Sequence, residues 1–376
     1  MNNDKQTRKV FYIDPMSMRN LARYDYNLLN GMESQVYYFC SRQYDYKTLP
    51  GIRYRKVFCY NGIKPVALKV TSYLLSYLVI FFYTLIVRPD IIHVQWCKIP
   101  KSDSLYMRLA KKLTGARIVH TAHNVLPHNT DRRYEDVYAR IYGMADAVIV
   151  HSRRTKEEIA AQFAVAREKI HVIRHGIIGM DGQAEHASAY DCYKCLDGRF
   201  VITSLGEQSY YKGIDVLADV WLSTPELCRA KDLMLVVVGK NKGLDLSPLG
   251  KADNVYVKDE KISDEEYMYL VRHTDVYMLP YREISQSGAL LTVMAEHIPV
   301  VVTDVGGLTD PFEYGRIGWI VPRLTKEALR DTLLAVVGNK DEARRIRSDK
   351  ATWQRVNARY DWREISRRTQ RLYESL

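Results

Sequence analysis

Three polar turns in the second half of the sequence follow apolar, strand-like runs, and each has residues suited to holding an anion. The turn "GEQSYYKG" (206–213) places Gly206 at the end of one run and Lys212 just before a helix-like stretch. A lysine at a helix start is unfavourable with the helix dipole unless an anion shares the site. Lys212 is therefore a candidate phosphate ligand; the alternative is a solvated loop charge.

The second turn, "YREISQSGAL" (281–290), lies between the apolar run "DVYMLP" and a helical pattern. Ser285 or Ser287 can cap that helix, and Gly288 lets a phosphate approach the backbone closely. The first turn of a helix presents unpaired N–H groups, which suit an anion. Helix capping without any ligand explains the same residues equally well.

The third turn, "TDVGGLTD" (303–310), has two glycines, Gly306 and Gly307, that permit unusual φ values and close ligand approach. A tight structural turn is again the alternative. In open α/β sheets, ligands bind beyond the carboxyl ends of the strands. Three such turns in one domain therefore favour one shared phosphorylated ligand.

In the first half, "HTAHNVLPHN" (120–129) ends another apparent strand and has three histidines. Their spacing does not match HExxH or another zinc pattern. His123, just past the strand end, can face a cleft and hydrogen-bond a sugar or a phosphate. A purely structural role for His123 is equally consistent with the sequence.

Several nucleotide and metal signatures are missing from the sequence. No GxGxxG follows a strand, no GxxxxGK[ST] is present, and no Asp-x-Asp pair could chelate a metal diphosphate. "CYKC" (192–195) has CxxC spacing, but no second pair or histidine cluster accompanies it. We therefore expect neither a bound metal nor a cofactor.

The 376 residues suit two domains, and the net charge of +11 indicates an anionic partner. Nucleic acid, phosphorylated small molecules and acidic membranes all qualify by charge alone. Six scattered cysteines and a polar N-terminal stretch predict a reduced, cytoplasmic setting. The apolar stretch 72–87 is short of the about 20 residues of a spanning helix. A buried helix, or one that dips into a bilayer interface, is the expectation.

Strand and helix patterns alternate through both halves, which predicts α/β domains with parallel sheets. We expect four parts: a domain over 1–180, a linker over 181–198, a second domain over 199–355 and a C-terminal helix over 356–376 that packs back on the first domain. The strands expected in the first half are "KVFYID", "SQVYYFC", "IIHVQW", "ARIVHTAH" and "AVIVHS". In the second half they are "RFVITSLG", "LMLVVVG", "NVYVKD", "DVYMLP" and "PVVVTD".

The segments "YYKGIDVL", "HTAHNVLPHN" and, most specifically, residues 280–322 together resemble the retaining nucleotide-sugar glycosyltransferases of family 4. This resemblance implies the GT-B fold: two facing Rossmann-like domains with a deep cleft between them. It also implies that the first domain binds the acceptor and the second the nucleotide-sugar donor.

Particular residues match the family's donor site. Lys212 matches the lysine that contacts the donor diphosphate, and Gly206 matches its strand-end glycine. Gln286, Ser287 and Gly288 fall where a helix N-terminus meets the diphosphate and sugar. His123 matches the first-domain histidine that reaches the donor sugar, and Gly306 and Gly307 occupy the loop close to the donor.

The sequence departs from this pattern at a few positions. Many members carry two glutamates eight residues apart around the second turn, where this chain has Ile284 and Thr292. Glu283, one residue away, is the candidate substitute. Where members often have an arginine in the "KG" turn, this chain has Ser209, so Arg282 is a candidate for stabilising the diphosphate.

The resemblance implies a metal-independent glycosyltransferase that retains anomeric configuration, with His123 and Lys212 as catalytic residues. Its expected acceptor is a saccharide, lipid-linked, in bacterial surface polysaccharide synthesis, and no nucleic acid is expected as a partner. Charge and the segment 72–87 suggest peripheral association with the inner face of an anionic cytoplasmic membrane. Two alternatives stay open: a sugar-nucleotide epimerase of the same fold, and a non-catalytic anion- or membrane-binding protein.

Overall fold

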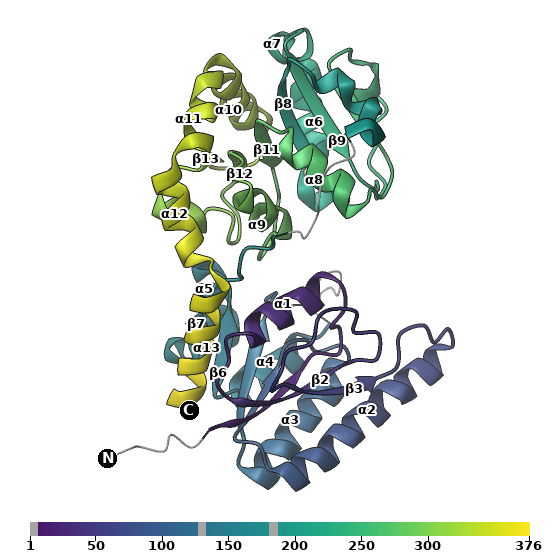
Figure 1. The fold of residues 1–376 in the computed structure, drawn as a ribbon, viewed down its shortest axis with the longest axis vertical. Coiled ribbons are helices and arrows are strands. Elements are labelled where there is room, and N and C mark those ends of the chain that lie inside the picture. The colour runs from purple at the N-terminus through teal and green to yellow at the C-terminus, as the bar shows by residue number, and fades with distance from the viewer. Residues whose placement is uncertain (1–6, 127–132, 180–186) are drawn as a thin grey trace. The chain divides into compact units, whose positions relative to one another are not determined.

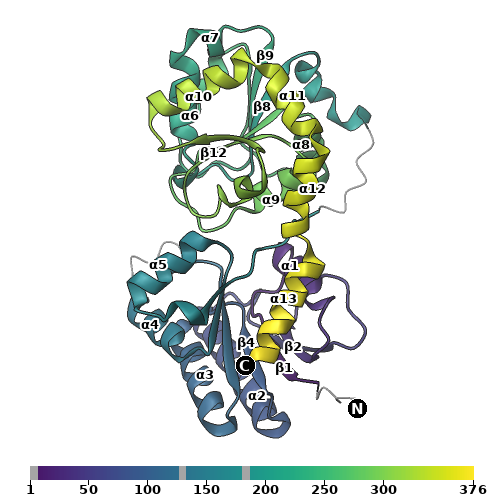
Figure 2. The ribbon, with the colours of Figure 1, turned by 90° about the vertical axis from the view of Figure 1, so that its left-hand side faces the viewer.

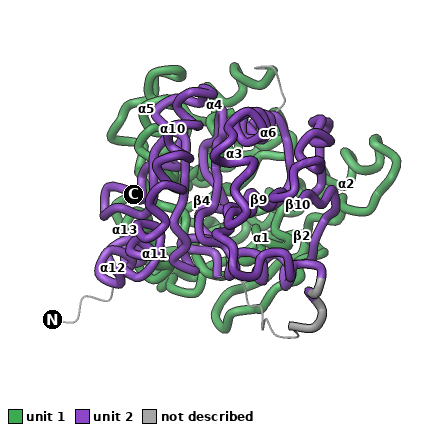
Figure 3. The backbone as a smooth tube through the Cα atoms, turned by 90° about the horizontal axis from the view of Figure 1, so that it is seen from above, with its two compact units in different colours: residues 1–176, 360–376 green, residues 177–359 purple. Residues whose placement is uncertain are grey.

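Two parallel sheets, each in its own unit of the chain, form the framework of the computed structural model, which describes residues 7–126, 133–179 and 187–376. Unit 1 comprises residues 1–176 and 360–376, and unit 2 comprises residues 177–359 (Figure 3). The chain thus enters unit 2 a few residues earlier than predicted. It returns to unit 1 at Tyr360 rather than at residue 356.

The sheet of unit 1 has seven parallel strands in the order β3-β2-β1-β4-β5-β6-β7. The predicted strands of this half are all present, and β3 and β7 are additions. Most of the strands are buried almost throughout, because helices cover both faces. They are β1 (Lys9–Ile13), β2 (Gln35–Ser41), β3 (Arg53–Phe58), β4 (Ile91–Val94), β5 (Arg117–Ala122), β6 (Ala147–Val150) and β7 (Ile170–Val172).

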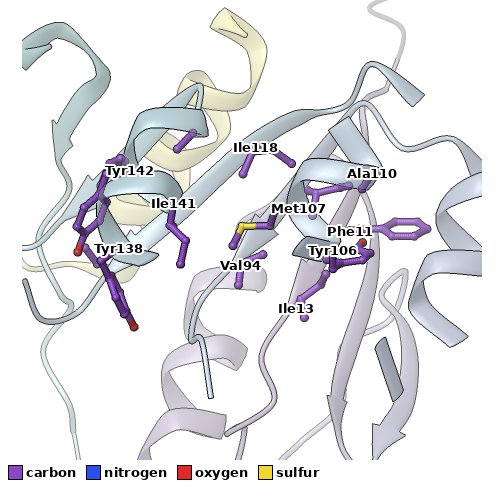
Figure 4. Close-up of a cluster of buried hydrophobic side chains, with 14 of the residues drawn as sticks. Phe11, Ile13, Val94, Tyr106, Met107, Ala110, Ile118, Tyr138, Ile141 and Tyr142 are labelled. Carbon is purple, nitrogen blue, oxygen red and sulfur yellow. The ribbon is translucent and has the colours of Figure 1, made fainter. Parts of the chain in front are cut away.

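The helices of unit 1 divide between the two faces of this sheet (Figure 1). Figure 4 shows side chains of α3 and α4 packed on β1, β4 and β5 in the core of one face. That face is covered by α2 (Val66–Val87), α3 (Pro100–Thr114), α4 (Glu135–Met144) and α5 (Arg153–Phe163). The other face is covered by α1 (Asn20–Leu29) and α13 (Trp362–Ser375).

The sheet of unit 2 has six parallel strands in the order β10-β9-β8-β11-β12-β13. Its strands are β8 (Phe200–Leu205), β9 (Leu233–Val238), β10 (Val255–Lys258), β11 (Val276–Leu279), β12 (Val300–Thr303) and β13 (Gly318–Val321). Its helices are α6 (Ile214–Ser223), α7 (Pro225–Cys228), α8 (Asp264–Arg272), α9 (Gly288–Ala295), α10 (Lys326–Gly338), α11 (Lys340–Ser348) and α12 (Lys350–Arg359). In both units the strand order reverses beside the first strand, which is where such sheets bind ligands.

The C-terminal segment is two helices rather than the single one predicted (Figure 2). Asp361 begins α13, because its carboxylate accepts from the N–H groups of Arg363 at 2.9 Å and Glu364 at 3.3 Å. Within unit 1, α13 packs on α1, and Ser366 Oγ donates to the Leu28 carbonyl at 2.6 Å.

The predicted linker over 181–198 is largely built into unit 2. Residues 187–196 form a 3₁₀ segment, while the predicted residues 181–186 lie outside the described residues. Tyr193 is buried, and its hydroxyl donates to Glu266 at 2.6 Å. Tyr193 thus connects the described part of the predicted linker to Glu266 of α8 (Asp264–Arg272).

Candidate functional site

The "KG" turn of unit 2 follows β8 and packs against the end of β11. Gly206 directly follows β8, and Lys212 ends a 3₁₀ turn, Tyr210–Lys212, that leads into α6. Gly213 has φ +69°, and a Cβ there would lie 2.0 Å from the carbonyl oxygen of Pro280. Glycine at this position therefore lets the lysine-bearing turn approach the second strand end.

Lys212 is buried without an anionic partner. Its side chain is 8% exposed, and within the described residues it has no hydrogen bond or ion pair. Its ammonium lies 5.9 Å from the centroid of the Tyr281 ring, and the nearby Glu207 pairs with Lys242 instead, at 3.5 Å. Burial lowers the pKa of Lys212 from 10.5 to about 8. An unpaired buried ammonium is costly, so this place favours an anion.

Arg282 connects the end of β11 to the 210–212 turn. Its guanidinium forms two hydrogen bonds with the Asp215 carboxylate, at 2.8 and 2.7 Å. It also stacks on the Tyr210 ring, 3.8 Å from the centroid, and donates to the Tyr210 carbonyl. Arg282 thus holds the 210–212 turn in place beside Lys212, and its contact with a diphosphate stays a prediction.

The "QSG" turn forms the start of α9 as the capping interpretation predicts. Ser287 is buried, and its hydroxyl accepts from the N–H of Leu290 at 3.3 Å. Gly288 is exposed, and a Cβ there would meet nothing within 4 Å. Gln286 is partly buried and has no hydrogen bond within the described residues. Capping by Ser287 leaves space in front of the helix N-terminus at Gly288, so the cap and an anion are compatible.

The "GG" turn lies directly against the "QSG" turn. Gly306 has φ +53°, and a Cβ there would lie 1.6 Å from the carbonyl oxygen of Ile284. The N–H of Gly307 donates to the carbonyl of Ser285 at 3.2 Å. Only glycine at position 306 allows this approach, so two of the three predicted turns form one surface.

Carboxylates are absent at the two positions where the resemblance expects them. Ile284 is partly buried, and Thr292 is buried in α9, where its hydroxyl donates to the Gly288 carbonyl at 3.1 Å. Glu283 is exposed and forms no hydrogen bond or ion pair within the described part of the chain. The role of Glu283 as the substitute carboxylate stays a prediction.

In unit 1, residues that directly follow three neighbouring strands form a hydrogen-bonded chain. Gln95 follows β4, His123 follows β5, and His151 follows β6. His123 Nε2 lies 3.0 Å from Gln95 Oε1, and its Nδ1 lies 3.2 Å from His151 Nε2. His151 Nδ1 in turn lies 2.8 Å from the Ile173 carbonyl. Gln95 and His151 were not predicted as site residues, although each directly follows a predicted strand, as His123 does.

The chain fixes the tautomer of His123. A carbonyl only accepts, so His151 carries its proton on Nδ1, and burial lowers its pKa to about 4, leaving Nε2 as an acceptor. His123 must then donate from Nδ1. Burial and the neighbouring His151 also lower the pKa of His123, so its neutral ring presents an unprotonated Nε2. The neutral ring needs a donor there. Gln95 Oε1 faces His123 and Gln95 Nε2 lies 3.0 Å from His93 Nε2, so this tautomer requires the Gln95 amide to be turned by 180°.

A pocket of about 360 Å³ opens beside His123 within unit 1. The Trp96 ring stacks on the His123 ring, with centroids 4.4 Å apart and planes 3° apart. Aromatic faces of this kind suit sugar rings and apolar groups. Other residues that line the pocket are Met16, Lys98, Pro100, Asn124, Tyr134 and Tyr138.

No group of three or more potential metal ligands occurs among the residues that the structure describes. His128, the third histidine of "HTAHNVLPHN", lies outside those residues. Cys192 and Cys195 are free thiols, as are Cys40, Cys59, Cys97 and Cys228. The described residues thus offer a candidate anion site in unit 2 and an aromatic-walled pocket in unit 1.

Solved structures define the class of protein as the two-domain GT-B fold. Sucrose-phosphate synthase from Thermosynechococcus elongatus is 18% identical, with a TM-score of 0.72 over 98% of each chain. Alr3699/HepE of Anabaena, solved with UDP and glucose, is 14% identical, with a TM-score of 0.69 over 98% of this chain and 100% of that one.

Family comparisons take the identification further. The model of Glycosyltransferase Family 4 matches residues 21–178, and that of Glycosyl transferases group 1 matches residues 199–339. The chain belongs to the glycosyltransferases that these two models describe. A curated relative, the phosphatidyl-myo-inositol mannosyltransferase of Mycobacterium leprae, is 28% identical over 166 residues. That match spans 44% of this chain and less than half, 43%, of the relative.

Proposed function

We propose that the protein transfers a sugar from a nucleotide-sugar donor to a saccharide acceptor, and that the donor diphosphate lies between Lys212 and the start of α9. The observation that carries the proposal is the buried Lys212, which has no anionic partner within the described residues. A diphosphate would supply the missing charge. The UDP-glucose and UDP complexes solved for Alr3699/HepE support a nucleotide-sugar as the class of donor.

Lys212 and the N–H groups after Ser287 are suited to the leaving group. In the transfer, the bond from the anomeric carbon to the phosphate oxygen breaks, and negative charge builds on the diphosphate. Preorganised positive groups stabilise that charge in the transition state. We propose that they do so here without a metal ion.

We propose that the reaction retains anomeric configuration. The acceptor oxygen attacks on the face that the diphosphate leaves, and the acceptor proton passes to a phosphate oxygen. The two glutamate positions are occupied by Ile284 and Thr292, so no carboxylate nucleophile is assigned. We assign neutral His123 and Glu283 to the donor sugar.

The acceptor is the less defined substrate. We propose that it occupies the pocket beside Trp96 and His123 in unit 1. The acceptor named for the mannosyltransferase relative is a phospholipid, which supports a lipid-linked saccharide. Such acceptors are used in bacterial surface polysaccharide synthesis, and we propose that role at the cytoplasmic face of a membrane. The six free cysteines are consistent with a reducing compartment.

A donor panel tests the function. UDP-, GDP- and other nucleotide sugars are first screened by thermal unfolding, since a ligand at 100 times its Kd adds about 2.7 kcal/mol of stability. The stabilising donor is then incubated with lipid-linked acceptors, and proton NMR reads the configuration of the new glycosidic bond. We expect stabilisation by one nucleotide class and a retained anomer.

The alternatives give different results in the same assays. Conversion of the donor sugar without any acceptor would indicate an epimerase. An inverted anomer would contradict the retaining mechanism but leave the transferase intact. Stabilisation by no nucleotide sugar at all would contradict the donor site at Lys212.

A further inference from the structure

Helix α2 exposes a long apolar stripe on the surface of unit 1. It has 22 residues and is apolar and long enough to cross a membrane by length and composition. Val66, Phe82 and Ile86 are 74%, 56% and 81% exposed. The other exposed apolar side chains of this helix are Leu68, Val70, Leu74, Leu75, Leu78, Val79 and Leu85.

The opposite side of α2 is anchored to unit 1 along its length. The Tyr73 hydroxyl donates to the buried Asp103 carboxylate at 3.0 Å, and Ser76 Oγ donates to the Val57 carbonyl at 2.8 Å. Thr84 Oγ1 lies 3.0 Å from the Tyr106 hydroxyl. A spanning arrangement would expose these polar groups to lipid, so α2 stays on the unit with one face outward. Of the two expectations for residues 72–87, the partly exposed helix is the one found.

Helix α3 extends the same apolar surface. It packs beside α2 (Figures 1 and 2), and both helices bury their inner sides in one core on the sheet. Leu105, Leu109 and Leu113, spaced four residues apart, are 48%, 36% and 52% exposed. We call the exposed apolar side chains of α2 and α3 the α2–α3 face. So many exposed apolar side chains on two neighbouring helices are unusual on a protein that stays in water.

The exposed charged side chains of α2 and α3 themselves are all basic. Five exposed basic residues lie on or next to the two helices, and none has an ion-pair partner among the described residues. The one acidic residue of the two helices, Asp103, is buried. The basic residues are Lys64, Arg88, Lys101, Arg108 and Lys112.

We propose that the α2–α3 face docks on a lipid bilayer with anionic headgroups, with α2 and α3 lying in the interface rather than across it. Apolar side chains enter the acyl boundary, and flanking lysines and arginines meet the headgroups. A second copy of the chain fits less well, since a two-fold contact would bring the same unpaired positive charges together. The proposal gives a surface to the membrane location proposed above, and it rests on no step of the transfer reaction.

Vesicle flotation of the full chain tests this surface. We expect the protein to float with vesicles of phosphatidylcholine mixed with phosphatidylglycerol, and to bind far more weakly to phosphatidylcholine alone. The double variant Leu75→Glu/Phe82→Glu should lose about tenfold or more of its binding. Ile320→Glu is the matched control, because Ile320 is 40% exposed but lies on β13 of unit 2, and it should float like the unchanged protein.

A second double variant tests whether the basic residues contribute to vesicle binding. Arg108→Gln/Lys112→Gln should lower binding to the anionic vesicles about tenfold or more, since each basic residue near the surface contributes about 1 kcal/mol. High salt should weaken the binding of the unchanged protein to the anionic vesicles in the same way. Binding that is affected neither by the double substitution nor by high salt would contradict a role for anionic headgroups.

Controls separate a lost surface from a lost fold or a lost donor site. Each variant should keep the thermal unfolding temperature and the donor stabilisation of the unchanged protein. If the double variant does not fold, Val79→Trp replaces it: its fluorescence should shift to the blue with anionic vesicles. The proposal is overturned by no flotation of the unchanged protein, by no blue shift, or by a dimer in solution that Leu75→Glu/Phe82→Glu dissociates.

Discussion

Lys212 in unit 2 and His123 in unit 1 each lie beyond the carboxyl end of a parallel strand, and burial lowers the pKa of both. The difference is in their partners. His123 is hydrogen-bonded to Gln95 and His151, so its neutral ring is satisfied within unit 1. Lys212 has no such partner among the described residues. The comparison teaches that hydrogen bonds within unit 1 compensate the burial of His123, whereas no described residue compensates the buried charge of Lys212.

Removing the charge of Lys212 should have the largest effect. Lys212→Met is expected to lower turnover by about 10²-fold or more, because a positive group at the leaving diphosphate is lost. It should also stabilise the ligand-free protein, since a pKa lowered from 10.5 to about 8 corresponds to a cost of roughly 3 kcal/mol in the charged state. Steady-state kinetics and denaturant unfolding at pH 7 measure the two effects. Unchanged turnover would remove Lys212 from the mechanism.

Disrupting the contact between the two glycine-bearing turns should have the second largest effect. Gly306→Ala should destabilise unit 2 by about 2 kcal/mol or more, because the new Cβ meets the Ile284 carbonyl and the backbone is left-handed. Gly288→Ala is the control, since its Cβ would meet open space and should cost little. Thermal unfolding compares the two variants. An equal loss of stability in the two variants would mean that the two turns are not in the close contact described above.

The smallest effect is expected in unit 1. His151→Phe removes the acceptor of the His123 Nδ1–H, so the ring loses its fixed tautomer, and kcat should fall about tenfold with little change in the donor KM. His151→Gln, whose amide oxygen can accept the same hydrogen bond, should restore part of the loss. Nitrogen-15 NMR of His123 reads the tautomer directly. A variant with normal kcat and a mixed tautomer would show that the hydrogen-bonded chain is structural only.

The sequence was sufficient for the features that depend on local pattern. Buried parallel strands have apolar runs in their sequences, so most strands of both sheets were predicted, whereas β3, β7 and β13 were not. β3 contains the basic residues Arg53, Arg55 and Lys56, β7 is only three residues long, and β13 only four. The break between α12 and α13 was missed, although Asp361 is an ordinary N-cap residue.

Features that depend on contacts between distant residues could not be predicted. Arg282 pairs with Asp215, which is 67 residues away in the sequence. Gln95 and His151 follow strands, as His123 does, but their hydrogen bonds with His123 join residues 28 apart, and no spacing rule predicts those bonds. The exposed side of α2 could not be predicted for the same reason, because only packing decides which side of an apolar helix the core covers.

The most direct test of the central claim is the pH dependence of nucleoside-diphosphate binding, measured by calorimetry on the unchanged protein and on Lys212→Met. The folded pKa of Lys212, about 8, lies below its ordinary value of 10.5, so the free site loses its positive charge as the pH rises through 8. A bound diphosphate would restore that charge by proton uptake. We predict that affinity falls about tenfold per pH unit above pH 8, with proton uptake, and that Lys212→Met binds weakly at every pH. Equal affinity of the two proteins, or binding that does not change between pH 7 and 10, would contradict the account.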